Sequence, residues 1–414
     1  MALLAGLAGC RPAEQEQAAV LRVANWGGPA VDPEFLQTER EIREGFERRH
    51  PGVRVQTESI PGEGQYLPKL MMMFVSGKAP DVIQLDASSA AVFINNDLVL
   101  DLTPLMQADR SFRLDNYFPN VAAIARRGDR LYAVPLDFTP VVMYYNKRLF
   151  DAAGVPYPQS GWTWADFLAT AKALTVTEPG KSAPTQYGLC FTNWMPGWVP
   201  WIWLNGGDVL SPDGRHAEGY FNGPQTHAAI QFLIDLIRKH RVAPSLSESA
   251  AAGVDLFRAE RAAMNVAGHW MLLDYRAAGL DIGVVALPSN TGKPETVIYA
   301  SGLAISRATK HRDLAWEYVK YMTSAEAQKP VLALGVAISA NREVARSFAG
   351  TEVEDAFLDE VAYARPPWGS RVERYELVED LGREMMEDVL TGGVPVEEAV
   401  RRAAALVDAD LRRR

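Results

Sequence analysis

The sequence has little of what marks the best-known enzyme and metal chemistries. Only two cysteines occur in 414 residues, which excludes a disulfide framework, and no Cys/His spacing suggests a metal site. It has no G-x-S-x-G elbow, Walker loop, H-E-x-x-H or C-x-x-C pattern. No run beyond the N-terminus reaches the ~18 apolar residues of a spanning helix. We therefore expect no metal, no cofactor and no catalytic residue.

An excess of positive charge is also missing. Lys and Arg number 42 against 51 Asp and Glu, so the formal charge is -9, which argues against binding to duplex nucleic acid. Hydrophobic residues make up 48% and charged residues 22%, as in ordinary globular proteins. The length indicates roughly two to three folding units.

The N-terminus is a short apolar run that ends on small residues at Cys10. The segment LAGC (residues 7–10) is similar to a bacterial lipobox, in which the cysteine carries the lipid. No basic stretch precedes it, and nine residues are too few for a complete signal. We interpret residues 1–20 as a truncated lipoprotein signal with a polar tether.

Hydrophobic periodicity predicts alternating strands and helices, typical of an α/β protein. Strands are expected at residues 21–26, 53–55, 82–85, 131–135, 141–145, 282–288 and 302–305. Residues 136–140 are expected to separate two of them. Helices are expected at residues 39–50, 66–75, 87–95, 225–240, 313–322 and in the tail from 371, broken at 392–395, with a further helix capped by Thr163.

Tryptophan is what the sequence has in abundance: ten residues, six of them between Trp162 and Trp203. If the stretch around 194–203 is helical, Trp194, Trp198 and Trp201 share one face. A face of indoles can stack on the apolar face of a sugar, although big aromatic rings are more often core. We expect Trp194 and Trp198 in a pocket, and we expect four other tryptophans in the core: Trp162, Trp164, Trp203 and Trp316.

Several motifs, in order along the chain, resemble those of extracellular solute-binding proteins of sugar ABC transporters, a family that includes maltose-binding proteins. They are SGKAPDVI (76–83), LYAVP with YYNKRLF (131–135 and 144–150), GWTWADF (161–167), AAMNVAGHW (262–270), SGLAI (301–305) and AWEYVKYM (315–322). Each is weak alone, and the ordered set is specific. The resemblance covers residue 21 to the C-terminus.

The resemblance implies a two-lobed periplasmic-binding-protein-like fold of type II. Each lobe would be a mixed, mostly parallel sheet flanked by helices, with a hinge of several chain crossings. One lobe would comprise residues 21–136 and 302–336, and the other 137–300 and 339–414. The crossings would lie near residues 135–137, 298–301 and 337–340, where a hinge can absorb rotation while both lobes stay rigid.

The ligand-binding residues that we expect lie at strand ends, at crossings or in the aromatic segments. Asp86 follows a strand and can accept hydrogen bonds from sugar hydroxyls or cap a helix. Asp137 binds hydroxyls or fixes the hinge, and Arg365 pairs with hydroxyls or a phosphate. Trp270 matches the position at which the family stacks sugar. The remaining expected residues are Asn25, Trp26, Tyr66 (with core packing as its other role), Trp194, Trp198, Ser301, Gly302 and Trp368.

The function that the resemblance implies is capture of a mono- or oligosaccharide for delivery to permease subunits. The chain would be monomeric, extracytoplasmic and attached to the membrane only through lipidated Cys10. One alternative is the same fold binding a glycerol phosphate ester or another polar solute. A glycosidase, motivated by the many carboxylates, ranks last because no catalytic motif is present.

Overall fold

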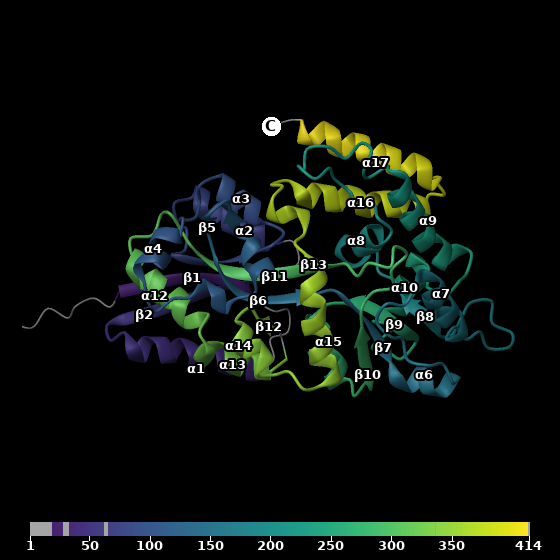
Figure 1. Ribbon diagram of the computed structural model, residues 1–414, viewed down its shortest axis with the longest axis horizontal. Helices are drawn as coiled ribbons and strands as arrows, with labels where there is room; N and C mark the ends of the chain where they lie inside the picture. The colour runs from purple at the N-terminus through teal and green to yellow at the C-terminus, as the bar shows by residue number, and fades with distance from the viewer. Residues whose placement is uncertain (1–18, 28–32, 62–64, 336, 413–414) are drawn as a thin grey trace, which may run out of the picture.

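The computed structural model describes residues 19–27, 33–61, 65–335 and 337–412, so the Cys10 prediction lies outside the described residues. Within these ranges, no helix is both long and apolar enough to cross a membrane. Two large sheets with helices packed around them, and one small hairpin, form the described part of the molecule (Figure 1). The α/β prediction is confirmed.

The first sheet has seven strands in the order β12-β6-β11-β3-β1-β2, with β13 added beside β11. These strands are β1 (Ala19–Gly27), β2 (Val53–Pro61), β3 (Val82–Asp86), β6 (Val134–Pro140), β11 (Thr296–Ile305), β12 (Ile338–Ser339) and β13 (Ala364–Arg365). The second sheet has the order β10-β7-β9-β8, from β7 (Val142–Asn146), β8 (Tyr187–Cys190), β9 (Ala262–Ala267) and β10 (Ile282–Val285). A small hairpin joins β4 (Arg126–Arg127) to β5 (Arg130–Leu131).

Both sheets are mixed, as predicted, but the expectation that they are mostly parallel is wrong. Strand β1 runs parallel to β2 and β3, whereas β11 runs antiparallel to β3 and β6. In the second sheet β7 is antiparallel to both of its neighbours. The reason is that β11 arrives from the second sheet and enters the first sheet against the direction of its βαβ strands.

Helices surround each sheet. Those associated with the first sheet are α1 (Pro33–Arg49), α2 (Tyr66–Val75), α3 (Ala90–Asn95), α4 (Thr103–Ala108), α5 (Pro119–Ala123), α12 (Arg312–Met322), α13 (Ala325–Ala333) and α14 (Arg342–Arg346), with the short η1 (Leu114–Asn116). The others are α6 (Lys147–Ala153), α7 (Trp164–Ala173), α8 (Met195–Leu204), α9 (Pro224–Arg238), α10 (Leu246–Ala252), α11 (Leu272–Ala277), α15 (Glu352–Glu360), α16 (Tyr375–Leu390) and α17 (Val396–Leu411), with η2 (His269–Met271), η3 (Val361–Tyr363) and η4 (Trp368–Ser370).

Local sequence signals explain several of these boundaries. Thr163 caps α7 as predicted: its hydroxyl accepts the Asp166 N–H, and Asp166 accepts the Thr163 N–H at 2.9 Å. The tail helices α16 and α17 are separated at the predicted Gly-Gly-Val-Pro break. The predicted separator at 136–140 is wrong, because β6 continues to Pro140. Proline is tolerated there as the last residue of the strand.

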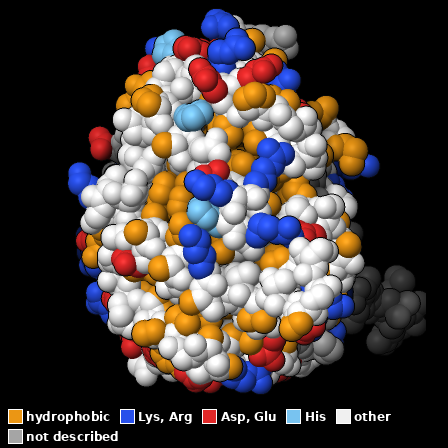
Figure 2. Space-filling view, turned by 90° about the vertical axis from the view of Figure 1, so that its right-hand side faces the viewer, with side chains coloured by type: hydrophobic (Ala, Val, Ile, Leu, Met, Phe, Trp, Pro, Cys, Tyr) orange, Lys and Arg blue, Asp and Glu red, His pale blue; other side chains and the backbone are white. Residues whose placement is uncertain are grey.

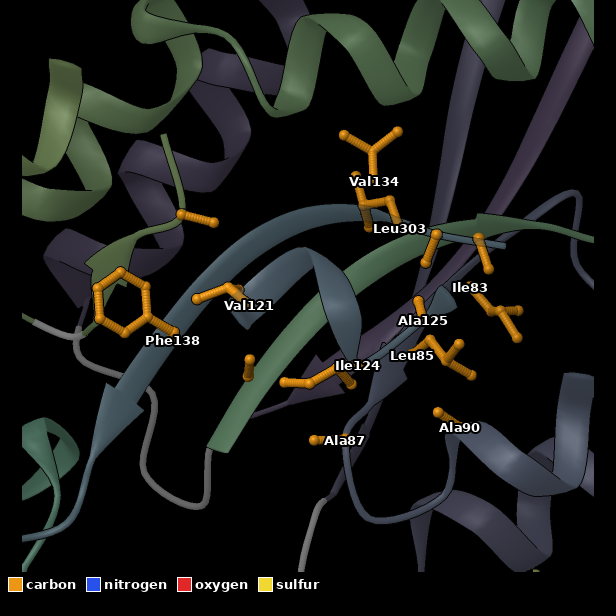
Figure 3. Packing of buried hydrophobic residues seen from close by; sticks show 14 of the residues in the cluster. Ile83, Leu85, Ala87, Ala90, Val121, Ile124, Ala125, Val134, Phe138 and Leu303 are labelled. Atoms are coloured by element: carbon orange, nitrogen blue, oxygen red, sulfur yellow. The ribbon is translucent and has the colours of Figure 1, made fainter. Parts of the chain in front are cut away.

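Two apolar clusters hold the structure together. In the first, Leu85 of β3 packs toward Val121 of α5, while Val134 of β6 and Leu303 of β11 point to the other face of the sheet (Figure 3). The second joins α7, α8, α9, α16 and α17 around the buried indoles. The four tryptophans expected in the core are confirmed there or in the first cluster: Trp162 (8% exposed), Trp164 (7%), Trp203 (2%) and Trp316 (4%).

The outer end of the molecule on the second-sheet side carries charged side chains of both signs, interspersed with apolar ones (Figure 2). Lys and Arg side chains gather near the middle of this face, whereas most acidic side chains lie toward its periphery.

Candidate ligand-binding site

Three adjacent strands of the first sheet bring two predicted carboxylates to one serine. Ser301 of β11 pairs across the ladder with Asp86 of β3 on one side and Asp137 of β6 on the other. Its hydroxyl donates to Asp137 Oδ1 at 2.7 Å and accepts from Gln84 Nε2 at 3.0 Å. Both carboxylates are half-buried. Residues far apart in the chain thus form one polar centre, which we call the carboxylate centre (Asp86, Asp137 and Ser301).

Burial is the main reason why the two carboxyl groups of the carboxylate centre have raised pKa values. Burial raises the pKa of Asp86 to about 6, with backbone N–H groups opposing and the Glu376 and Asp137 carboxylates adding to the rise. Burial likewise raises the pKa of Asp137 to about 6 against the Ser301 hydrogen bonds. On α16, burial and then Asp86 raise the pKa of Glu379 to about 8. Groups of this kind gain from a ligand that donates hydrogen bonds.

An aromatic pair borders the carboxylate centre on the first-sheet side. The Trp26 ring meets the Tyr66 ring edge-on at 5.3 Å, and the Trp26 backbone N–H donates to Gln84 Oε1 at 3.3 Å. Tyr66 is 5% exposed, and its hydroxyl donates to the Gln84 carbonyl at 2.7 Å. Asn25 is already bonded to Glu39 and Ser59. Trp26 is therefore the half-exposed group here, while Tyr66 supports the strand ends.

A second aromatic group, the aromatic trio of Trp194, Trp270 and Tyr299, comes from three separate segments. Trp194 and Trp270 meet edge-on with ring centres 5.8 Å apart, and Tyr299 lies 6.2 Å from each. The indoles are 40% and 38% exposed, unlike the buried tryptophans of the second apolar cluster. Exposed, clustered indoles offer flat apolar faces with a polar rim, which suits sugar stacking.

The aromatic trio and the carboxylate centre share one face of a two-stranded ladder. Tyr299 and Ser301 are two residues apart in β11, opposite Thr139 and Asp137 of β6. Side chains two apart in a strand point to the same side. The pKa of Tyr299 is raised by burial and also by Glu379, Tyr375 and the Asp86 carboxylate.

Other predicted site residues lie away from this face. Nine of the ten residues of α8 are buried, so the expected single indole face does not exist, and Trp198 is 1% exposed. Trp368 is 3% exposed and donates to Asp208 at 2.9 Å. Gly302 is a buried position of β11 beside a register shift. The structure does not bring Trp198 or Trp368 to the aromatic trio.

Arg365 is engaged within the second-sheet half. Its guanidinium bonds to Glu295 at 2.8 Å and to Asp208 at 2.5 Å, and it lies 3.9 Å above the Trp203 ring. The Arg365 guanidinium thus contacts two carboxylates and an aromatic ring. The sequence had suggested that it would bind a hydroxyl or a phosphate of the ligand.

Sequence reasoning missed Gln84, Tyr299 and Glu379. Gln84 could have been found, because it lies in the predicted strand 82–85, two positions before Asp86. Tyr299 lies within a crossing that was predicted, but one tyrosine among 14 carried no signal of its own. Glu379 lies in a charge-rich helix, where nothing local distinguishes it from solvated neighbours.

Comparisons with known proteins agree with this architecture. The model of the bacterial extracellular solute-binding protein family matches residues 31–329. The chain is 27% identical over 324 residues to the multiple sugar-binding protein of Streptococcus mutans, covering 72% of this chain and 70% of that protein. It is 30% identical over 193 residues to an uncharacterized lipoprotein of Streptomyces antibioticus, covering 46% and 40%.

Among solved structures, the chain resembles an ABC substrate-binding protein from Listeria monocytogenes in complex with cycloalternan. The TM-score is 0.84 at 23% identity, covering 95% of this chain and 99% of that one. This likeness shows the fold, a two-lobed periplasmic-binding-protein fold of type II as predicted. The family match, which spans most of the chain, shows more: this chain belongs to the bacterial extracellular solute-binding protein family.

Proposed function

We propose that this protein is the substrate-binding component of a carbohydrate ABC importer and that it binds a neutral sugar. The observation that carries the proposal is the pair of exposed indoles, Trp194 and Trp270, which lie against Tyr299 on the ladder face of the carboxylate centre. The ring face of a sugar stacks on indoles, and its hydroxyls donate to carboxylates. The similarity to a sugar-binding relative supports this ligand class.

A phosphate ester is a poor match for the same site. The charges that act on Asp86 and Glu379 come from other carboxylates, so an anion would be repelled. Arg365, the cation suggested by the sequence, is already paired with Asp208 and Glu295. We therefore rank the glycerol phosphate alternative below a neutral sugar.

We also propose that the protein performs no hydrolysis. Asp86 and Asp137 lie on either side of Ser301 in neighbouring strands and face the same side of the sheet. A glycosidase needs two carboxylates that flank the scissile bond, one as acid and one as nucleophile or base. Two carboxylates on one sheet face, with a serine hydroxyl between them, suit hydroxyl recognition instead.

The binding residues that we propose are Asp86, Asp137, Ser301, Trp26, Trp194 and Trp270, joined by Gln84, Tyr299 and Glu379. We propose lobes of residues 21–136 with 302–336 and of 137–300 with 339–414. The three expected crossings fall in strands β6, β11 and β12, which lie side by side in the first sheet. Adjacent strands can bend together, so ligand contacts on both sides favour a closed state.

We propose that the protein is a monomer held outside the cytoplasm by a lipid on Cys10 and that it delivers its ligand to permease subunits. The similarity to a lipoprotein relative and the family match support this arrangement.

Isothermal titration with maltose, maltotriose, cycloalternan and glycerol 3-phosphate tests the ligand class. We expect binding of at least one neutral sugar and none of the phosphate ester. Trp270→Ala should weaken sugar binding strongly, while the matched core substitution Trp316→Phe should leave the Kd unchanged. Binding of glycerol 3-phosphate alone, or release of reducing sugar on incubation, would overturn the proposal.

A further inference from the structure

The turn that carries Trp270 is held from three sides. The Tyr144 hydroxyl of β7 donates to the Gly268 carbonyl at 3.0 Å, and the His269 N–H donates to Thr139 Oγ1 of β6 at 2.7 Å. The His269 ring, 2% exposed, places Nε2 2.9 Å from Glu354 Oε2 of α15. The backbone of this turn is thereby tied to β6 and β7, and its one long polar side chain to α15.

The Trp270 ring depends directly on the shape of this turn. A Cβ atom on Gly268 would lie 2.2 Å from Trp270 Cζ3, so the ring packs against the bare glycine. The φ of Gly268 is -98°, which any residue can adopt, so the glycine is needed for space and not for backbone freedom. A small displacement of the turn must therefore tilt the indole.

Thr139 connects the turn to the binding face, by which we mean the face of the β6–β11 ladder that carries Tyr299 and the carboxylate centre. It stands opposite Tyr299 in the β6–β11 ladder and two residues after Asp137. Its hydroxyl donates to the Pro140 carbonyl at 3.1 Å and accepts the His269 N–H, so both of its hydrogen-bonding roles are used. Strand β6 therefore fixes the position of the turn 268–270 relative to the carboxylate centre.

Glu354 holds the other side of the turn. Its second oxygen accepts from Arg276 of α11 at 3.3 Å, and the Phe357 ring meets the His269 ring edge-on at 4.9 Å. The His269 side chain is therefore fixed by a carboxylate and by a ring of the same helix. Rotamers locked in this way keep a binding group within the small tolerance that stacking requires.

We infer that Thr139 and Glu354 are positioning residues that act through His269 to fix the orientation of Trp270 for ligand stacking. Neither touches the ligand, and each sets the affinity by holding the turn 268–270. The inference rests on the proposed function only for the identity of the ligand.

Two pairs of variants and one control test the inference. Thr139→Val keeps the shape but removes the acceptor, leaving a buried N–H without a partner, and Thr139→Ser restores the hydroxyl. His269→Ala removes the contact with Glu354, and His269→Gln can donate to it. Thr296→Val is the matched control, because Thr296 is buried in β11 and donates to the Val141 carbonyl outside the binding face.

The first readout needs no ligand. In protein labelled with 5-fluorotryptophan, the Trp270 resonance is assigned by its loss in Trp270→Phe. We expect it to shift or broaden in Thr139→Val and His269→Ala and to stay in place in Thr139→Ser, His269→Gln and Thr296→Val. An unchanged Trp270 resonance in Thr139→Val and His269→Ala would overturn the inference, whatever the protein binds.

The second readout is the Kd for maltotriose, chosen as the probe. We expect about a tenfold rise in Thr139→Val and His269→Ala and less than a twofold change in the two restoring variants and the control. An equal rise in Thr296→Val would mean that lost stability alone weakens binding and would refute the positioning role. If the wild-type protein binds no sugar at all, the proposed function fails, and the fluorine spectra still decide the inference.

Discussion

Asp137→Asn should stabilise the ligand-free protein at alkaline pH while it weakens ligand binding. The amide oxygen of asparagine can still accept from the Ser301 hydroxyl, which lies 2.7 Å from Oδ1 in the wild type. The substitution therefore removes the charge and keeps the hydrogen bond. If the substitution raises stability and lowers affinity, the charge of Asp137 serves ligand binding at the expense of stability.

The size of the effect follows from the raised pKa. Burial takes the pKa of Asp137 from 3.8 to about 6. A raised folded-state pKa means that the contribution of this carboxyl is fully present below pH ~3.8 and is lost as the pH rises through about 6. At ~1.36 kcal/mol per pH unit, the wild type loses at most about 3 kcal/mol over this window. The Asp137→Asn variant has no carboxyl to ionise and carries no such loss.

Urea denaturation followed by tryptophan fluorescence, at pH 4 and pH 8, measures the difference. We expect Asp137→Asn to match the wild type at pH 4 and to exceed it at pH 8. Asp166→Asn is the control of opposite sign, because hydrogen bonds from Thr163 lower the pKa of Asp166. That control should lose stability at pH 8 relative to the wild type, and the loss should shrink as the pH falls. Equal changes for Asp137→Asn at both pH values would refute the reasoning.

Three further outcomes are expected. Trp270→Ala should raise the Kd for a neutral sugar at least tenfold in titration calorimetry with little change in the melting temperature, since the ring is 38% exposed; a large fall in melting temperature would contradict its place at the surface. Arg365→Ala should destabilise the protein by about 2 kcal/mol in urea, because it removes the cation that pairs with Asp208 and Glu295, and it should create no difference between neutral and anionic ligands. Gly369→Ala should lower the melting temperature by several degrees, because its Cβ would lie 2.1 Å from the Ser88 carbonyl; an unchanged melting temperature would show that η4 yields easily.

Local signals in the sequence were enough for much of the fold. The Thr163 cap, the stop at the Gly-Gly-Val-Pro break and the run of Val82 to Leu85 each depend on a few neighbouring residues, and each predicts its element correctly. The predicted end of the strand before residue 136 was wrong. Proline interrupts the interior of a strand, but Pro140 is the last residue of β6, where it is tolerated.

The arrangement of the residues on the binding face could not be predicted from local sequence signals. Asp86, Asp137 and Ser301 could be named because each ends a strand or lies at a crossing. Their common meeting point depends on the β3-β11-β6 strand order, which no local pattern encodes. The burial of Trp198 depends on the closeness of α16, where its ring lies 3.1 Å from a Cβ position at Gly382. Contacts of this range are set by tertiary packing.

Strand β11 has a consequence for the smallest ligand that the protein can distinguish. The Cα atoms of Tyr299 and Ser301 are held about 7 Å apart by the rise of one strand, and this spacing does not depend on the relative position of the lobes. The strand therefore works as a molecular ruler about as long as one sugar ring. With the binding residues that we propose, a solute shorter than this spacing would reach the aromatic trio or the carboxylate centre but not both, so we expect the strand to set a lower limit on ligand size.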